Sequence, residues 1–464
     1  MATAQMKTSK TLLLIVLFLL FLTSVFPPPL YSQTAGGDLD NDGDIDFNDY
    51  YFLVESFAYA GCGNIADIDK NCLVDILDYN ILVENFGYGA TPTPSVQKES
   101  AMYRANPQHT GIYETKEVPS LNRIRWQLRP GNSGAASAPT VANGIVYFGS
   151  WDDYLYAVDA QTGLTRWTFH AQDFINYEPA VENDTVYFGD YAGYFYAVDI
   201  NTQQEKWRFL TKSDKSGISF ARNVKSPPTI ASGKVYFSDS TGRLYALDTR
   251  TGQEIWEVEY PLIFRMTSPA IVDDIAYFGS EAGYLFAVDT NTGQVIWNFK
   301  TTYGGSIWAS PAVIQGKVYF PSNDGFLYAV EAQTGRYLWA YKYKPQHIQM
   351  VFPQPVAVLN GKIYLSGTND NIFEVLDAET GTLQGSFLTE SWVESPPSIA
   401  ENTMYFGTHD LEGNHNGYLY AVDTQTLQEK WKWRTQRLGI NTSPVVSEGT
   451  VYFKDEDGYI YALE

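Results

Sequence analysis

A repeated phrase runs through most of the 464-residue chain and restricts the folds that it can adopt. The phrase reads DYLYAVDAQTGLTRW from Asp153, GYLFAVDTNTGQVIW from Gly283 and GYLYAVDTQTLQEKW from Gly417. Its acidic position returns about every 40 to 50 residues, at Asp159, Asp199, Asp248, Asp289, Glu331, Asp377, Asp423 and Glu464. A period of this length is typical of propellers and solenoids, in which one repeat forms one structural unit.

The pattern within each repeat favours a propeller. Each repeat contains four short β-type runs, and these runs are apolar on both alternating faces, as in residues 154–158. A strand that is apolar on both faces must be covered on both, which blades stacked around an axis achieve. The turn before the Tyr-Leu-Tyr run holds residue types that tolerate a left-handed backbone: Gly193, Gly242, Gly283, Gly325, Gly417 and Gly458, with Asp153 and Asn371 in the other two repeats.

The two ends of the repeat region predict how the ring closes. The eighth repeat reaches Glu464 without its tryptophan strand, and the segment NRIRW supplies Trp126 ahead of the first repeat. The tryptophan column then holds Trp126, Trp167, Trp207, Trp256, Trp297, Trp339 and Trp431, while the sixth repeat has Gly385. We therefore predict an all-β fold, an eight-bladed β-propeller over residues 101–464, closed by strand 122–128.

The repeated YAVDxxTGxxxW and the lead-in MYRANPQHTG from Met102 resemble the pyrroloquinoline quinone-type propeller repeat family, over residues 101–464. That family includes quinoprotein alcohol dehydrogenases, the propeller lipoprotein of the outer-membrane β-barrel assembly machinery, and many exported propellers of unassigned role. We interpret the tryptophan column as blade packing rather than as a cofactor site.

The N-terminal 33 residues are typical of a secretory signal. Lys7 and Lys10 precede the apolar run TLLLIVLFLLFL, which is short for a membrane span, and prolines 27–29 follow. An uncleaved anchor is the alternative, because no clean small-x-small cleavage site is visible. We expect a secreted or cell-surface protein without a membrane span after signal removal. The net charge of −22 argues against nucleic acid as a partner.

Residues 34–90 hold two loops with the spacing of calcium sites. A twelve-residue loop that places oxygens at alternate positions, with a glycine such as Gly43 at the sharp turn, encloses a hard cation. The first loop offers Asp38, Asp40, Asp42, the carbonyl of Asp44, Asp46 and Asp49, and the second offers Asp67, Asp69, Asn71, Leu73, Asp75 and Asp78. We expect one or two calcium ions; a solvated acidic linker is the alternative.

Each loop leads into a matching run, DYYFLVESF or DYNILVENF, that we expect to be helical, and the duplicated unit over residues 38–87 resembles a type I dockerin. The resemblance implies a cohesin-like or cell-surface protein as partner, although Phe47 with Asn48 and Ile76 with Leu77 replace the usual Ser/Thr pairs. Cys72 stands in the glycine position of the second loop, and we expect a disulfide between Cys62 and Cys72 in an oxidising compartment. Residues 91–100 form a Pro/Ser-rich linker.

Enzymatic interpretations find little support in the residues. The resemblance implies that a quinone enzyme would carry adjacent cysteines, and residues 101–464 contain no cysteine, so pyrroloquinoline quinone is not expected. A glycosidase would need a distinct carboxylate pair, whereas the recurrent acidic residues occupy turns. A metal site could be imagined from His409, Asp410, Glu412 and His415, but a solvated hairpin insertion is the favoured interpretation because no third ligand position is specified.

Binding is the favoured function. The connections between blades should line one mouth of the channel, and they hold aromatic and polar side chains that could stack on sugars or grip a peptide, or could instead plug the channel: Tyr177, Arg222, Lys225, Arg265, Trp308, Phe352, Gln354 and Trp392. We expect a non-catalytic scaffold or ligand-binding propeller, tethered through the dockerin-like module and acting in polysaccharide breakdown or cell-surface assembly. A carbohydrate-active or quinone-dependent enzyme using the same mouth is the alternative.

Overall fold

The computed structural model describes residues 101–131, 134–212, 222–259, 266–343, 353–366, 371–409, 417–435 and 439–464. All of them belong to the unit Lys98–Glu464. The predicted signal, both calcium loops with their ligand residues, Cys62, Cys72 and the linker lie outside the described residues. Among the residues that are described, no helix has the length and apolar character needed to cross a membrane.

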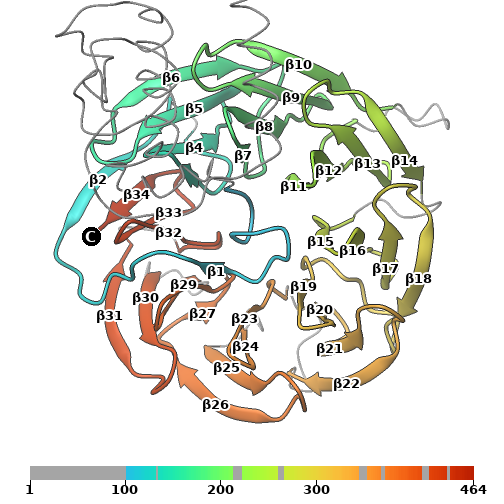
Figure 1. The fold of residues 1–464 in the computed structure, drawn as a ribbon. Coiled ribbons are helices and arrows are strands. Elements are labelled where there is room, and N and C mark those ends of the chain that lie inside the picture. The colour runs from blue at the N-terminus through green and yellow to red at the C-terminus, as the bar shows by residue number, and fades with distance from the viewer. Residues whose placement is uncertain are drawn as a thin grey trace, which may run out of the picture. The chain divides into compact units, whose positions relative to one another are not determined.

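The described residues form eight sheets arranged around a central axis (Figure 1). Blade one contains β3 (Thr140–Ala142), β4 (Ile145–Gly149), β5 (Tyr154–Asp159) and β6 (Thr165–His170). Blade two contains β7 (Ala180–Glu182), β8 (Thr185–Gly189), β9 (Tyr194–Asp199) and β10 (Glu205–Leu210). Blade three contains β11 (Thr229–Ala231), β12 (Lys234–Ser238), β13 (Arg243–Asp248) and β14 (Glu254–Glu259). Blade four contains β15 (Ala270–Val272), β16 (Ile275–Gly279), β17 (Tyr284–Asp289) and β18 (Val295–Lys300).

The second half of the ring continues this order. Blade five contains β19 (Ala312–Ile314), β20 (Lys317–Ser322), β21 (Phe326–Glu331) and β22 (Tyr337–Lys342). Blade six contains β23 (Ala357–Leu359), β24 (Lys362–Leu365), β25 (Ile372–Asp377) and β26 (Leu383–Leu388). Blade seven contains β28 (Ser398–Ala400), β29 (Thr403–His409), β30 (Tyr418–Asp423) and β31 (Glu429–Arg434), with β27 (Trp392–Val393) paired to β29 and β1 (Ile112–Tyr113) to β28. Blade eight contains β32 (Val445–Ser447), β33 (Thr450–Lys454), β34 (Ile460–Leu463) and β2 (Ile124–Leu128).

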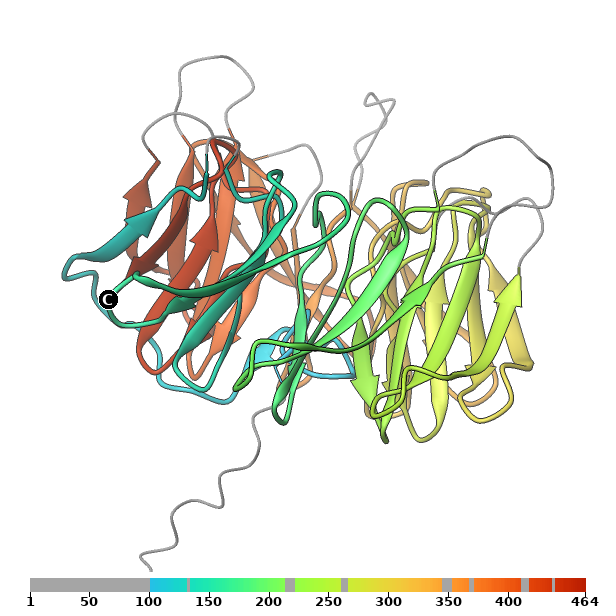
Figure 2. The ribbon, with the colours of Figure 1, turned by 90° about the horizontal axis from the view of Figure 1, so that it is seen from above.

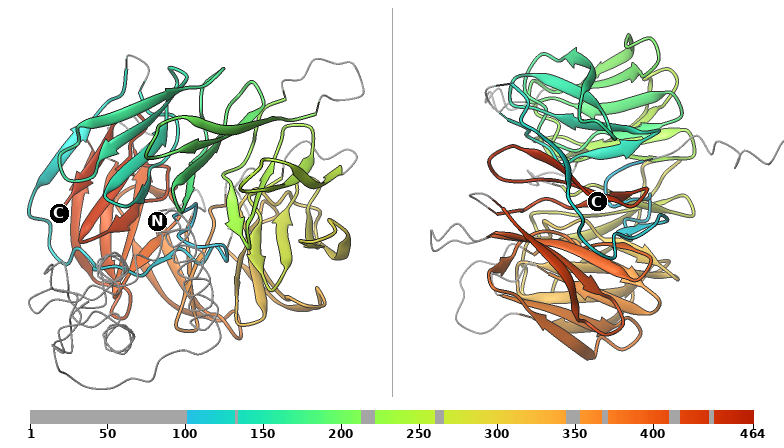
Figure 3. Two further views of the ribbon diagram at one scale, coloured as in Figure 1. Left: turned by 45° about the horizontal axis from the view of Figure 1, so that its top comes forward. Right: turned by 90° about the vertical axis from the view of Figure 1, so that its left-hand side faces the viewer.

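The predicted closure is confirmed. β2 pairs antiparallel with β34, and Ile124 lies opposite Leu463 while Trp126 lies opposite Ala462. Figures 1 and 3 show β2 beside the red C-terminal strands. The side chain of Glu464 accepts hydrogen bonds from Arg123 and Arg125, which extends the junction beyond the strands. An N-terminal strand therefore completes the last blade. Four strands follow the same order in every blade, and the sheet of blade seven also contains β1 and β27.

The hydrophobic core lies between neighbouring blades, whose strands stand side by side around the ring in the side view of Figure 2. Phe195 of blade two stacks on Phe237 of blade three with ring centroids 3.9 Å apart. Buried clusters of this kind combine the second and third strands of adjacent blades. The two apolar faces seen in each repeat are thus covered by two different neighbours, as the sequence predicts.

Tryptophans of the column join a blade to the next one at several junctions. The Nε1 atom of Trp126 donates to the carbonyl of Ala160, 2.8 Å away, and equivalent bonds join Trp207 to Thr249 and Trp256 to Thr290. The ring lies against the glycine of the facing turn, where a Cβ added to Gly163 would lie 2.7 Å from the Trp126 ring. The column is blade packing, as expected.

The recurrent acidic residues cap turns. Asp159 Oδ1 accepts hydrogen bonds from the backbone amides of Gln161 and Thr162 and from the Thr162 hydroxyl. The same pattern recurs at Asp248, Asp289, Asp377 and Asp423. These carboxylates stabilise the turn that leads to the outer strand.

Candidate functional site

One end of the ring, here called the connection face, is formed by the connections between blades and by the hairpins between the second and third strands. The two kinds of segment pack together: the amide of Ile175 in the connection 171–179 donates to the carbonyl of Ser150 in the hairpin 150–153. Ile307 and Ser280 repeat this contact between blades four and five. Because strands alternate in direction, both segment types must reach the same end of the ring.

The lead-in 101–113 runs across the innermost strands. Backbone amides of these strands donate to it at one blade after another: Ile271 to Pro107, Val313 to Gln108, Val358 to Thr110 and Ile399 to Gly111, while Ala101 forms a bridge with Val181. The lead-in ends as β1, which is parallel to β28. The segment therefore supplies hydrogen-bond partners for inner strand edges of five blades.

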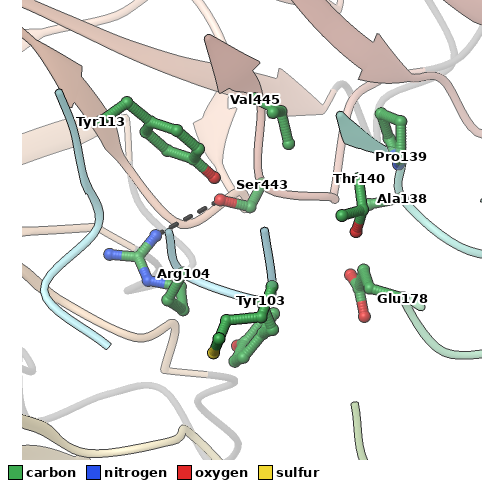
Figure 4. A pocket seen from close by; sticks show the side chains of 10 residues that line it. Tyr103, Arg104, Tyr113, Ala138, Pro139, Thr140, Glu178, Ser443 and Val445 are labelled. Carbon is green, nitrogen blue, oxygen red and sulfur yellow. Dashed lines mark hydrogen bonds between the residues drawn. The ribbon is translucent and has the colours of Figure 1, made fainter. Parts of the chain in front are cut away.

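Arg104 anchors the lead-in. Its buried guanidinium donates to the carbonyl oxygens of Pro397 (2.6 Å) and Val356 (2.7 Å) and to the hydroxyl of Ser443 (3.3 Å), the last contact being drawn in Figure 4. Gly111 has a φ of +70°, and a Cβ there would lie 2.2 Å from Arg104 Nη2. The close approach of chain and guanidinium thus requires glycine at this position.

A small cavity remains beside Arg104, between the lead-in and blades one and eight (Figure 4). It is lined by Met102, Tyr103, Arg104, Tyr113, Ala138, Pro139, Thr140, Glu178, Ser443 and Val445. The cavity has room for about one water molecule. Burial raises the pKa of Glu178 from 4.5 to about 7, so this carboxyl is partly protonated at neutral pH.

An aromatic row on the connection face runs from the hairpin of blade one to the connection that follows blade two. Trp151 packs against Phe174 with ring centroids 4.8 Å apart, and Phe174 stacks on Tyr191 at 4.2 Å. The ammonium of Lys225 lies 4.4 Å from the centroid of the Tyr191 ring. Trp151 is 46% exposed, whereas Phe174 and Tyr191 are half-buried, so the row is partly open to solvent and has a cation at its other end.

The predicted mouth residues occupy the blade connections, as expected from the strand order. Tyr177 follows blade one, Arg222 and Lys225 follow blade two, Trp308 follows blade four, Gln354 follows blade five, and Trp392 lies in β27 after blade six. Arg265 and Phe352 lie outside the described residues. Of the predicted set, Lys225 belongs to the aromatic row. The set predicted from the sequence did not include Trp151, Phe174 and Tyr191. The sequence Trp-Asp-Asp at a turn indicates an exposed aromatic side chain and could have pointed to Trp151.

His409 lies at the end of β29 between two glutamates. Its Nδ1 atom is 3.2 Å from Glu394 Oε2, and its Nε2 atom is 3.3 Å from Glu456 Oε2. Glu394 precedes β28, and Glu456 belongs to the hairpin between β33 and β34. Asp410, Glu412 and His415, which the sequence offered as companions of His409, lie outside the described residues. Neither glutamate could be associated with His409 from spacing, because they stand in other connections and repeats.

These features define a closed propeller whose lead-in crosses the inner strands and whose connection face carries an aromatic row. The chain belongs to the family described as outer membrane protein assembly factor BamB, whose model matches residues 119–299 and 242–464. This match confirms the predicted pyrroloquinoline quinone-type propeller family. No curated protein matches the sequence significantly.

Solved structures share the fold at low sequence identity. BamB from Moraxella catarrhalis is 16% identical with a TM-score of 0.59, over 74% of this chain and 99% of that one. The quinohemoprotein alcohol dehydrogenase from Comamonas testosteroni is 15% identical with a TM-score of 0.62, over 78% of this chain and 80% of that one. A europium-containing methanol dehydrogenase is 16% identical with a TM-score of 0.60, over 80% of this chain and 90% of that one. At identities this low the likeness shows a shared fold and assigns no function.

Proposed function

We propose that this protein is an exported, non-catalytic binding propeller that holds an extended segment of a partner protein on its connection face. The observation that carries the proposal is the aromatic row from Trp151 to Tyr191 with Lys225 at its end. Aromatic and basic side chains are enriched at protein-binding surfaces, where rigid rings contribute contact area at low entropic cost. The cation favours a partner segment that carries acidic as well as apolar side chains.

A binding role is further supported by the composition of the propeller. The cysteines of the sequence lie at positions 62 and 72, before the propeller, so the propeller lacks the adjacent pair that quinone enzymes of the resembling family use. Pyrroloquinoline quinone therefore has no role in the proposal.

The proposed location is extracytoplasmic, at the cell surface or secreted. The signal-like N-terminus and the family description, which names an outer membrane assembly factor, both support this location. We further propose that residues 38–87 bind one or two calcium ions and a cohesin-like or other cell-surface protein, on the strength of the duplicated loop spacing. The propeller would then act as a tethered binding module.

The test uses the full-length protein and two probes: a library of acidic-aromatic peptides and a panel of soluble plant-type oligosaccharides. Binding is followed by titration calorimetry. Trp151→Ala and Tyr191→Ala should each weaken peptide binding by roughly tenfold or more, because both remove ring contact area. Tyr337→Ala is the matched control, since Tyr337 is 51% exposed but stands on the outer strand β22.

The outcomes separate the alternatives. Peptide binding that Tyr337→Ala weakens as much as Trp151→Ala would contradict the assigned surface. Binding of oligosaccharides but not peptides, lost in Trp151→Ala, would replace the protein partner with a glycan. Dye-linked alcohol oxidation after addition of pyrroloquinoline quinone would overturn the non-catalytic assignment.

A further inference from the structure

We propose that His409 and Glu456 bind a divalent transition-metal ion of the zinc class on the connection face between blades seven and eight, with Glu394 positioning the imidazole. This site is separate from the aromatic row, and the proposed function does not require it. One ligand atom from each residue lies within 4.8 Å of the others. The three residues belong to three separate segments of the chain, and folding brings them together.

Backbone pairing holds all three residues in place. His409 lies opposite Trp392 and Thr408 opposite Val393 in the pairing of β29 with β27, and Glu394 follows directly. Gly439 connects the other side, because its carbonyl accepts the amide of Glu456 and its Cα lies against His409. A Cβ on Gly439 would lie 2.5 Å from the Cα of His409. Ligands held by strands and close backbone contacts are preorganised for an ion.

The donor set selects the class of ion. An imidazole nitrogen with carboxylate oxygens suits zinc and its neighbours, whereas calcium and magnesium prefer sets made of oxygen alone. In the proposed metal-bound form, the two ionised carboxylates and the imidazole together carry two negative charges, which a divalent cation balances. The side chains of His409, Glu394 and Glu456 are 15%, 23% and 17% exposed, so an ion could enter from solvent yet remain partly shielded.

The two ring nitrogens take different roles in this arrangement. In the proposed metal-bound form Nδ1 carries the proton and donates to Glu394, 3.2 Å away, which leaves the lone pair of Nε2 for the ion. The Glu456 carboxylate, beside Nε2, is the second ligand, and water completes the coordination shell. Carboxylates that fix the tautomer of a ligating histidine in this way strengthen metal binding, so Glu394 is a positioning residue.

Protonation of His409 is the competing explanation for its position between two glutamates. A protonated His409 would donate from both nitrogens and bridge the two glutamates without any metal. The two explanations differ in what a glutamine does. Glu394→Gln keeps an oxygen acceptor for Nδ1–H and should retain most metal binding, whereas Glu456→Gln removes a ligand. A purely protonic bridge binds no ion in either variant.

The experiment is titration of the full-length protein with Co²⁺ in excess calcium, which occupies the predicted N-terminal loops. Visible absorbance reports ligation, and quenching of Trp392 reports proximity. His409→Gln and Glu456→Gln should each weaken Co²⁺ binding roughly 10- to 100-fold, and Glu394→Gln should weaken it less. Trp392→Phe should retain the absorbance and lose part of the quenching.

Matched controls are His170→Gln, an exposed histidine of β6, and Glu379→Gln, an exposed glutamate after β25. Both should bind Co²⁺ like the wild type, and thermal unfolding of each variant establishes that it is folded. Co²⁺ binding that is equal in wild type, His409→Gln and Glu456→Gln, or absent from all of them, would overturn the proposal.

Discussion

Leu427 fills the space that a tryptophan occupies at other blade junctions, because the position that faces it, Gly385, has no side chain. A Cβ added to Gly385 would lie 2.6 Å from Leu427 Cδ1. At the junction of blades eight and one the pair is reversed, with Trp126 against Gly163. Leu427 also adopts a φ of +56°, a left-handed value that glycine adopts with less strain. One large and one small residue thus share the same volume in either arrangement.

Introducing tryptophan at position 385 together with glycine at position 427 should show that the effects of the two substitutions on unfolding free energy are strongly coupled. Gly385→Trp alone should destabilise the propeller because the indole would overlap Leu427, and Leu427→Gly alone should destabilise it by leaving a cavity. The double variant should recover stability, with a coupling free energy of about 1–3 kcal/mol between the two positions. Urea unfolding measured by fluorescence gives the double-mutant cycle. Additive effects would contradict the exchange of volume.

Trp126 should contribute strongly to ring closure. It is 7% exposed, its Nε1 atom donates to Ala160, and its strand completes blade eight. Trp126→Ala should lower the free energy of unfolding by about 3–5 kcal/mol. Trp126→Phe should lose less, since it retains most of the packing and forfeits mainly a hydrogen bond worth about 1 kcal/mol. Equal losses in the two variants, measured by chemical denaturation, would argue against packing as the main contribution.

The lead-in should depend on Arg104. Arg104→Met deprives the carbonyls of Val356 and Pro397 of their donor, at a cost of about 1–3 kcal/mol for each carbonyl left buried without a partner. Amide hydrogen exchange should then accelerate at Ile271, Val313 and Val358, whose amides donate to the lead-in. Unchanged exchange at these amides would show that the lead-in is held by its backbone bonds alone.

Glu178 should make stability depend on pH in a definite direction. Its pKa in the folded protein is about 7, above the ordinary 4.5, because burial disfavours the charged form. The carboxyl therefore contributes stability that is fully present below about pH 4.5 and is lost as the pH rises through about 7. Glu178→Gln should unfold at a higher temperature than the wild type above pH 7, with the advantage fading toward about pH 4.5. A difference that does not vary with pH would contradict the raised pKa.

Calcium removal should affect the N-terminal module alone. Chelation should abolish an unfolding transition that arises from residues 34–90 and leave the propeller transition unchanged, because ligand binding stabilises only the unit that binds. Asp38→Ala with Asp67→Ala should reproduce the effect of the chelator, as both residues begin a predicted loop. Scanning calorimetry with and without calcium measures both transitions.

The eight-bladed fold follows from the sequence by itself. The patterns that predict it are local and recur in the repeats: alternating apolar strands, glycine at tight turns and a tryptophan at a fixed position. The missing tryptophan strand of the last repeat predicted the pairing of residues 122–128 with the C-terminal strand, which the register of β2 and β34 confirms. Periodicity reports such features reliably, because neighbours in the chain are also neighbours within a blade.

Only the tertiary structure revealed the path of the lead-in, the aromatic row and the surroundings of His409. Residues 101–111 have no strand pattern, and their backbone partners belong to five blades distributed around the ring. Glu394 lies beside His409 because β27 pairs with β29, and Glu456 reaches it from the hairpin of the neighbouring blade eight. Contacts of this kind are set by ring geometry and by which connection folds over which hairpin. No local pattern of residues encodes them, since the partners are far apart in the chain.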